Sequence, residues 1–218
     1  MNSLTEENYL KAIYHLSKEG NALVTTNNIA DSVSTKASSV TDMLKKLADK
    51  NLIHYVKYQG VSLTGEGLQA ALGIIRKHRL WEVFLVEKLN FKWDEVHDIA
   101  EELEHIRSEE LVDRLQEFLG NPKSDPHGDL IPDKHGKFHK KELIRLSKMK
   151  VGDSGSISGV NEHSAGFLRY LEKTGLVLGK KVVIYEIIEF DSSVTLLVDN
   201  QEITVSRDVA KNILVYEQ

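Results

Sequence analysis

Apolar residues recur at helical spacing early in the chain and predict two short helices before residue 34. The first spans residues 5–18, and Ser3 with Glu6 at its beginning matches a capping box. The second spans residues 25–33, where threonine and asparagine precede the apolar positions as N-capping residues do. The pattern therefore indicates that the chain begins with helices.

A third helix is predicted over residues 36–49, with Ser34 or Thr35 as its N-cap. Its apolar positions fall on one face, which consists of Val40, Leu44 and Leu47. Two β-rich runs around Gln59 and Gly60 follow and predict a hairpin. Three short helices and a hairpin are typical of a winged helix-turn-helix, whose third helix enters the major groove of DNA. A small helical domain that binds no DNA has the same pattern.

The middle of the chain predicts three further helices. Residues 64–89 carry too many apolar side chains for one face, which is typical of a helix that is sandwiched or lies in a dimer interface. Residues 93–106 and 108–120 predict the other two, and Ser108 is a suitable N-cap for the second. The stretch 121–138 contains all three prolines and predicts a linker or an ordered loop, with "PHGDLIP" as a structural turn rather than a ligand site.

From Met149 onward, short β-rich runs with tight turns predict a small β-barrel of roughly seventy residues. One short helix, around residues 165–175, interrupts it. The fold class is therefore mainly α with a β C-terminal domain. We expect a winged helix-turn-helix at residues 1–70, a helical domain at 71–140 and the β-domain at 148–218.

Composition narrows the chemistry that these domains can carry. The chain has no cysteine, so it forms no disulfide, and oxygen and imidazole ligands would have to hold any metal. No apolar stretch reaches the roughly 18 residues of a membrane helix, and the N-terminus lacks the basic and apolar regions of a signal peptide. We therefore expect a soluble, cytoplasmic protein without a membrane partner.

The net charge of −5 hides an uneven distribution. Residues 1–60 contain seven Lys and six Asp or Glu, whereas residues 61–120 contain seven Lys or Arg and thirteen Asp or Glu. The acidic residues thus concentrate in the middle of the chain, where nine residues, "HDIAEELEH" at 97–105, include four acids and two histidines.

Helical geometry divides this acidic stretch. At about 100° per residue, one arc of about 100° holds four potential metal ligands, His97, Glu101, Glu104 and His105. Glu102 lies off this arc, and the apolar residues face elsewhere. Like charges on one arc repel each other, and a divalent cation would reverse that repulsion. The pattern therefore favours a divalent metal site, with a solvated acidic face as the alternative.

The preceding helix supports the metal interpretation, because His78 and Glu82 stand at i, i+4 on one of its faces. An enzyme is not expected. Glu102-Leu-Glu-His105 is only one of the two Glu-x-x-His motifs that a di-metal carboxylate enzyme needs. The His-Glu-x-x-His motif of zinc hydrolases, a Gly-rich phosphate loop and a recognisable Ser-His-Asp arrangement are absent.

The whole chain resembles the diphtheria-toxin-repressor-like family of iron- and manganese-dependent transcriptional regulators, in particular the members with an SH3-like C-terminal domain. The fragments that carry the resemblance are "ENYLKAIY" at 7–14, "SSVTDMLKKL" at 38–47, "RKHRLWEVFLVEKL" at 76–89, "VHDIAEELEH" at 96–105 and "PHGDLIP" at 126–132. Each fragment alone is moderately specific. Together, and with the order of the domains, they are highly specific.

The resemblance implies two neighbouring metal sites at the junction of the DNA-binding and dimerisation domains. The primary, activating site would use Asn8, Glu101, Glu104 and His105. The ancillary site would use His78, Glu82 and His97, joined by Glu162, or else His163, from the C-terminal domain.

Three positions bear on which metal is bound. Asn8 stands where the family usually has methionine or aspartate, and its amide oxygen is a weaker donor than a carboxylate. Lys11 stands where some manganese regulators have a second acid, which argues against a closely spaced dinuclear site. Glu101 stands where members specialised for iron tend to have cysteine. This set suits Mn²⁺ or Fe²⁺, for which Zn²⁺ or another divalent ion could substitute.

The resemblance therefore implies a metal-dependent transcriptional repressor that controls metal-uptake genes. Without metal, repulsion between Glu101 and Glu104 would leave the first helix free to shift. Bound Mn²⁺ or Fe²⁺ would favour the homodimer that binds double-stranded operator DNA, and no organic substrate is expected. The side chains expected at the DNA are Lys36, Ser38, Ser39, Thr41, Asp42, Lys45, Lys46 and Lys57.

Overall fold

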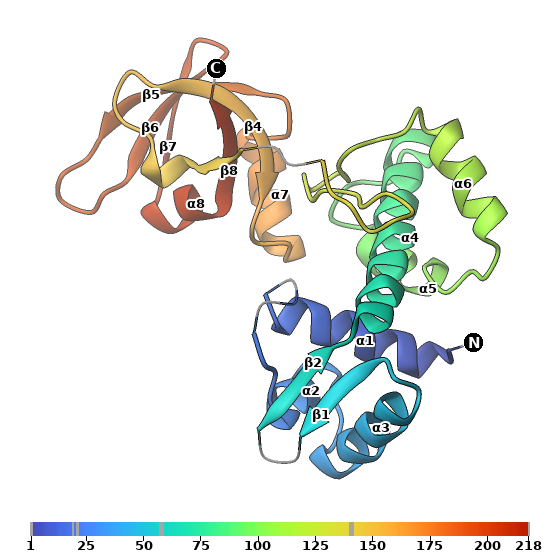
Figure 1. Ribbon diagram of the computed structural model, residues 1–218. Helices are drawn as coiled ribbons and strands as arrows, with labels where there is room; N and C mark the ends of the chain where they lie inside the picture. Colours follow the sequence, from blue (N-terminus) through green and yellow to red (C-terminus); the bar gives the residue numbers. More distant parts are fainter. Residues whose placement is uncertain (1, 19, 21, 57–58, 140–141, 218) are drawn as a thin grey trace. The chain divides into compact units, whose positions relative to one another are not determined.

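The computed structural model describes residues 2–18, 20, 22–56, 59–139 and 142–217, which form two compact units (Figure 1). The first unit comprises Met1–His78, Glu101–Asp113 and Pro132–Phe138. The second unit comprises Arg79–Ala100, Arg114–Ile131 and His139–Gln218.

Helix α1, Leu4–Leu16, opens the first unit. The predicted capping box is confirmed: the Ser3 hydroxyl accepts the Glu6 backbone N–H at 3.3 Å, and the Glu6 carboxylate accepts the Ser3 N–H at 2.7 Å. On its inner face Leu10 and Ile13 are fully buried in the core of this unit. Helix α1 is thus fixed both at its beginning and along one face.

Helices α2, Thr26–Ser32, and α3, Ala37–Asp49, follow as predicted. The turn between them includes Ser34, which has a positive φ of 50°. The expected N-cap at Ser34 or Thr35 is wrong, because Lys36 takes that position and its side chain makes no capping hydrogen bond. The first turn of α3 therefore has no side-chain cap on its backbone N–H groups.

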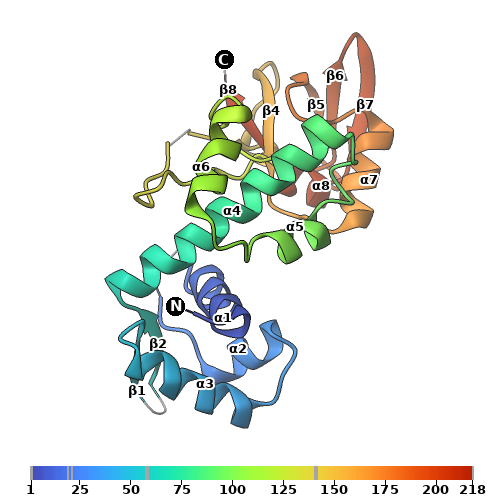
Figure 2. The same cartoon turned by 90° about the vertical axis from the view of Figure 1, so that its right-hand side faces the viewer.

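The predicted hairpin is confirmed by the antiparallel strands β1, Ile53–Val56, and β2, Gly60–Leu63. It contacts α3 and completes a winged helix-turn-helix (Figures 1 and 2). Lys57, expected at the DNA, lies outside the described residues. One apolar cluster, drawn from the three helices, the hairpin and the beginning of the next helix, forms the core of this unit.

That next helix, α4, spans Gly65–Leu89 and contributes residues to both units. The Thr64 hydroxyl donates to the Asn51 carbonyl at 2.7 Å and accepts the Gly67 N–H at 3.0 Å. A side chain at Gly67 would overlap the carbonyl of Leu52, so only glycine allows α4 to begin this close to the hairpin. None of the described helices combines the length and the apolar character that a membrane span requires.

Helix α5, His97–Leu103, is shorter than the helix predicted over 93–106. Glu104 and His105 lie in the turn that follows it. The arc that was predicted to hold Glu104 and His105 assumed a continuous helix, so it does not give the directions of these two side chains. Glu104 is in fact fully buried, whereas Glu102 is exposed, as expected from its place off the arc.

Helix α6, Glu109–Phe118, begins after Ser108, whose hydroxyl accepts the Leu111 N–H at 3.2 Å. The predicted N-cap is confirmed. Residues 121–138 then form an ordered loop without regular helices or strands, apart from an isolated bridge between Ser124 and Leu130.

An antiparallel six-stranded sheet with the order β3-β8-β4-β5-β6-β7 dominates the second unit. Its strands are β3 (Ile144–Arg145), β4 (Ser154–Val160), β5 (Lys181–Ile187), β6 (Val194–Val198), β7 (Gln201–Val205) and β8 (Ile213–Glu217). The 3₁₀ helix η1, the predicted helix α7 and a further helix, α8, complete it at Leu146–Lys148, Ala165–Thr174 and Arg207–Asn212. The sheet and the helices enclose one apolar core. The predicted class, mainly α with a β C-terminal domain, is confirmed.

The loop at "PHGDLIP" packs directly on strand β4. The Val160 N–H donates to the His127 carbonyl at 3.0 Å. Gly128 has a positive φ of 91°, and a side chain there would overlap the backbone of Ser158 and Gly159. This close approach holds the backbone of His127 against the β-domain.

Glu6 links α1 to the end of α3. Its carboxylate is almost fully buried and lies 3.2 Å from the Lys46 ammonium and 2.8 Å from that of Lys50. Burial alone would raise its pKa, but the hydrogen bonds from Lys50, Ser3 and Lys46 outweigh burial and lower the pKa to about 2. The folded protein therefore favours the ionised form.

Replacing Glu6 with glutamine should destabilise the protein at neutral pH by about 1–3 kcal/mol, given that both lysines are partly exposed to solvent. The ordinary pKa of this group is 4.5, so its contribution is fully present above that pH and declines as the pH falls toward 2. Urea unfolding, followed by circular dichroism at pH 7, 4 and 3, should show the gap between the parent and Glu6→Gln narrowing. Glu102→Gln, at an exposed acid, is the matched control; an equal gap at all three pH values would contradict the assignment.

Candidate metal centre

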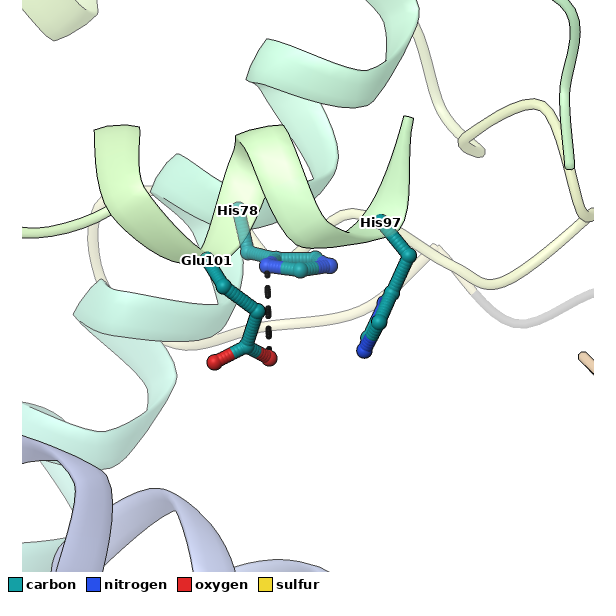
Figure 3. Close-up of side chains that lie close together, drawn as sticks. All are labelled: His78, His97 and Glu101. Atoms are coloured by element: carbon teal, nitrogen blue, oxygen red, sulfur yellow. Dashed lines mark ion pairs between the residues drawn. The ribbon is translucent and has the colours of Figure 1, made fainter. Parts of the chain in front are cut away.

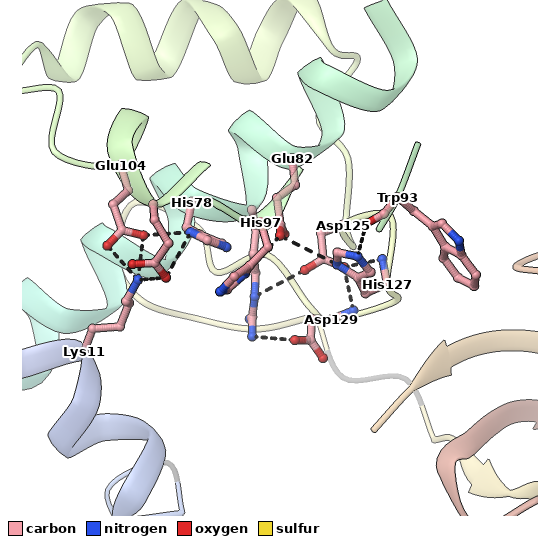
Figure 4. Close-up of polar contacts among 11 residues, drawn as sticks. Lys11, His78, Glu82, Trp93, His97, Glu104, Asp125, His127 and Asp129 are labelled. Carbon is pink, nitrogen blue, oxygen red and sulfur yellow. Dashed lines mark hydrogen bonds and ion pairs between the residues drawn. The ribbon is translucent and has the colours of Figure 1, made fainter. Parts of the chain in front are cut away.

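A group of polar side chains in the first unit, called here the Lys11 cluster, contains most of the ligands expected for the primary site. Its members come from α1, α4, α5 and the turn after α5, and they are Glu7, Lys11, His78, Glu101, Glu104 and His105. Figure 4 shows Lys11 extending from α1 toward Glu104, with His78 on the other side of that carboxylate.

The ammonium group of Lys11 lies between two carboxylates. It donates to Glu101 Oε1 at 2.6 Å and to the two oxygens of Glu104 at 2.7 and 2.8 Å. The Lys11 side chain is 13% exposed and that of Glu104 is 0% exposed. The expected repulsion between Glu101 and Glu104 in the metal-free protein is therefore compensated, because a positive group of the chain itself lies between them.

The buried carboxylate of Glu104 is held on a second side by His78, whose Nδ1 lies 2.7 Å from Oε2. Burial raises the pKa of Glu104, but the hydrogen bond with His78 and the charge of Lys11 outweigh it and lower the pKa. His78 Nδ1 also lies 4.0 Å from Glu101 Oε1, the pair joined by a dashed line in Figure 3. His78, expected in the ancillary site, thus contacts two residues expected in the primary one.

His105 is oriented by a residue that the sequence did not single out. Its Nδ1 lies 2.6 Å from Oε2 of Glu7, and its Nε2 lies 3.8 Å from Oε1 of Glu104. A carboxylate on one imidazole nitrogen directs the other nitrogen toward a metal and raises its basicity. Glu7 therefore has the geometry of an orienting residue for His105.

Asn8 is exposed on α1. Together with Lys11 and Glu101 it lines a hollow of about 380 Å³, which is also lined by Ser32, the last residue of α2, and Ser34. In the described part of the chain, no hydrogen bond joins Asn8 to Glu101. Asn8 thus lies beside the cluster without contacting its carboxylates.

A second polar group, in the second unit, is called here the Glu82 cluster. Its members are Arg79, Glu82, His97, Asp125, His127 and Asp129. The buried Glu82 Oε1 lies 3.7 Å from Nδ1 of His97 and also 3.7 Å from Nδ1 of His127. Glu82 and His97, both expected in the ancillary site, are therefore neighbours here (Figure 4).

His127 belongs to the turn expected to be structural, and its buried ring also faces Glu82. Nε2 lies 2.7 Å from the Trp93 carbonyl, and the ring stacks against Trp93 and His163 at centroid distances of 6.2 and 5.2 Å. Burial lowers the pKa of His127, but the hydrogen bond and charge of Glu82, together with Asp125, raise it to about 9.

Asp125 organises this turn. Its Oδ1 accepts the backbone N–H groups of His127 and Asp129 at 2.8 and 3.0 Å, and its Oδ2 lies 3.6 Å from Nε of Arg79. Burial, followed by the charges of Glu82 and Asp129, raises the pKa of Asp125 to about 7. The cluster therefore concentrates acidic groups around the fixed charge of Arg79.

The two alternatives for a ligand from the C-terminal domain have different surroundings. Glu162 is exposed, and its carboxylate accepts the Ser164 N–H at 2.8 Å, which lowers its pKa. His163 lies 3.1 Å from the Val160 carbonyl through Nε2 and stacks on His127. Of the two, His163 is the one in contact with a member of the Glu82 cluster.

The side chains expected at DNA lie on the outer face of α3 or just before it, where all the described ones except the half-buried Thr41 are exposed. Thr41 donates its hydroxyl to the Ala37 carbonyl at 3.0 Å, and Lys45 pairs with Asp42 at 3.3 Å. Lys46 forms an ion pair with Glu6, which connects α3 to α1. Lys36, Ser38 and Ser39 remain exposed at the beginning of the helix.

Comparison with family models covers nearly the whole chain in three segments. Residues 1–61 match "Iron dependent repressor, N-terminal DNA binding domain", residues 64–133 match "Iron dependent repressor, metal binding and dimerisation domain", and residues 144–217 match the FeoA domain. A solved manganese-dependent transcriptional repressor in complex with manganese is 32% identical, covers 98% of this chain and all of its own, and superposes with a TM-score of 0.84.

This chain belongs to the iron-dependent repressor family.

Other members of the iron-dependent repressor family support this assignment. The iron-dependent repressor IdeR of Mycobacterium leprae is 27% identical over 99% of both chains. The crystal structure of ScaR with bound Zn²⁺ is 36% identical, covers 96% of this chain and 98% of its own, and has a TM-score of 0.74. The resemblance drawn from the sequence fragments is therefore confirmed, and so is the expectation of a transcriptional regulator rather than an enzyme.

The residues of the Lys11 cluster fit the hard divalent ions named for relatives in the iron-dependent repressor family. Glu101 and Glu104 offer carboxylate oxygens and His105 offers an imidazole nitrogen, and the chain has no thiolate. The position between the two carboxylates already holds a positive group, the Lys11 ammonium. Both the donor set and the charge of the cluster therefore suit a cation.

If Glu7 orients His105, Glu7→Leu should weaken Mn²⁺ binding by about 10- to 100-fold, the usual cost of losing an orienting carboxylate. Isothermal titration calorimetry at neutral pH measures this directly. Glu102→Gln should bind Mn²⁺ as the parent does, because Glu102 is exposed and lies outside both clusters. An unchanged dissociation constant for Glu7→Leu would exclude Glu7 from this role.

Proposed function

We propose that the chain represses transcription of metal-uptake genes when Mn²⁺ or Fe²⁺ binds to the Lys11 cluster. Glu101, Glu104 and His105 would hold the ion, with Asn8 at the edge of the hollow as a further oxygen donor. The observation that carries this proposal is the ammonium group held between Glu101 and Glu104, because it marks the position as one that requires a cation.

Helix α1 supplies the link between this cluster and DNA. One side of α1 presents Glu7 and Lys11 to the cluster. The adjacent Glu6 contacts Lys46 on α3 and Lys50, the residue that ends it. A small displacement of α1 by the cluster would therefore be transmitted to α3 through the charge-assisted contacts of the buried Glu6 carboxylate.

The DNA interface would be the exposed face of α3. Lys36, Ser38 and Ser39 lie around its beginning, where the backbone N–H groups have no side-chain cap and could bind phosphate. Lys45, Lys46 and, from the sequence alone, Lys57 are further phosphate candidates. Thr41 and Asp42 are candidates for contacts inside the groove.

We infer an ancillary role for the Glu82 cluster. Glu82 and His97 would belong to the second metal site, completed by Glu162 or His163. The family resemblance adds His78, a member of the Lys11 cluster, as a further ligand. The contact between His163 and His127 favours His163, because it brings the C-terminal domain to the cluster through this side chain. The proposed assembly is a homodimer on double-stranded operator DNA, with domains at 1–70, 71–140 and 148–218.

Metal should tighten DNA binding by about 5- to 150-fold, the usual range for coupled sites. Fluorescence anisotropy on a duplex from the promoter of the chain's own gene, with excess Mn²⁺ or with chelator, measures this factor. Glu104→Gln should abolish the Mn²⁺ effect, and Glu102→Gln should retain it. Equal affinity with Mn²⁺ and with chelator would instead favour a metal-independent winged-helix protein.

If α3 is the DNA-binding helix, the Lys45→Ala variant should have a lower affinity for DNA. If Lys45 contacts phosphate, the variant should lose affinity by a similar factor for every DNA sequence, and the slope of log affinity against log salt should fall by about one. Lys92→Ala removes an exposed charge in the second unit and should leave both quantities unchanged. A loss confined to the operator would indicate that Lys45 contacts a base.

A further inference from the structure

We propose that Lys11 is a tethered competitor for the metal: its ammonium group occupies the carboxylates in the metal-free protein and must leave before both can bind an ion. This inference rests on the proposed function of the Lys11 cluster and concerns its regulation. In this proposal, Lys11 determines the metal concentration at which the repressor responds.

The Lys11 ammonium group has close contacts with three carboxylate oxygens. One belongs to Glu101 and the other two are those of Glu104, all at 2.6–2.8 Å. Glu104 is fully buried, so water weakens its contacts with Lys11 less than it weakens an exposed ion pair. The chain therefore carries its own cation in the position that the ligands surround.

Lys11 and a divalent ion cannot use these oxygens together. Bonds from carboxylate oxygen to hard divalent ions are about 2.0–2.2 Å long, so an ion shared by Glu101 and Glu104 would have to approach the oxygens that now contact the ammonium group at 2.6–2.8 Å. Two positive charges that share the same oxygens in a largely buried site repel each other strongly. The ammonium group must therefore move away from at least one carboxylate.

The structure offers a place for the displaced side chain. The hollow of about 380 Å³ is lined by Lys11 itself and also by Ser32 and Ser34. Lysine has a flexible four-carbon stem and donors that rotate freely, so it can exchange carboxylate partners for hydroxyl groups and water. Lys11 could thus leave the carboxylates while α1 stays folded.

Removing the competitor should strengthen metal binding. Lys11→Met keeps the length and apolar stem of the side chain but removes the charge, and it should bind Mn²⁺ at least tenfold more tightly by calorimetry. In the metal-free state the same variant should melt at a lower temperature than the parent, because Glu101 and Glu104 lose their counterion. Mn²⁺ should then raise its melting temperature by more than it raises that of the parent. Lys92→Met, an exposed charge in the second unit, should match the parent in all three measurements.

A measurement on the unmodified chain avoids any folding defect of the variant. With ¹⁵N-labelled lysine, the Lys11 ammonium protons should exchange slowly with water in the metal-free protein, because the ammonium group is mostly buried and bonds two carboxylates. Saturating Zn²⁺, which is diamagnetic, should shift this signal and accelerate the exchange. A slowly exchanging signal that persists at saturation would show that Lys11 stays with the carboxylates and would overturn the inference.

The outcomes separate this inference from the proposed function. If the parent chain binds no Mn²⁺ by calorimetry and its DNA affinity ignores metal, the proposed function fails. If the parent binds Mn²⁺ but Lys11→Met binds it equally or more weakly, the function stands and the competition is wrong.

Discussion

The buried carboxylate of Glu104 is the constraint on which the candidate site depends. A carboxylate without solvent contact is costly unless a positive group or several hydrogen bonds compensate it, and Glu101 adds a second negative charge beside it. Lys11 and His78 supply that compensation. Because Lys11 comes from α1 and Glu104 from the turn after α5, the compensation also holds these two segments together. Any cation that replaces Lys11 must also compensate the charge of Glu104 and connect α1 to the turn after α5.

Helix α1 can serve two partners because it carries buried charge on two sides. Glu6 is anchored by lysines at the end of α3, and Lys11 is anchored by the acidic turn. These contacts are short, and the Glu6 and Glu104 carboxylates are both buried, so a change at one anchor of the helix would act on the other. In the proposed function, the cluster would be coupled to DNA through this one helix, which is held on both sides.

Local patterns in the sequence predicted much of the fold, because apolar periodicity, capping residues and turn residues act over a few positions. They located α1 to α4, the hairpin and the β-domain. The site was predicted only in outline. The acidic stretch gave its location, but the helical arc assumed that α5 continues past Leu103, whereas the chain turns there and buries Glu104. The pairs that shape the site lie far apart in the sequence, by 93 residues for Lys11 and Glu104 and by 26 for His78 and Glu104, and periodicity carries no information about them.

The two clusters differ in how firmly their positively charged side chains are held. The positive side chain of the Lys11 cluster can be displaced more easily than those of the Glu82 cluster. Arg79 in the Glu82 cluster bonds the Leu130 carbonyl and Asp129, and His127 is tied to the Trp93 carbonyl at 2.7 Å. Neither side chain can move away easily, because moving the planar guanidinium or imidazole group would break hydrogen bonds that hold the turn. Among the described residues, Lys11 is held by the two carboxylates, and it also lines a hollow. If metal binds as proposed, the Lys11 ammonium group could move aside more readily than Arg79 or His127, and binding at the Lys11 cluster would change the structure more.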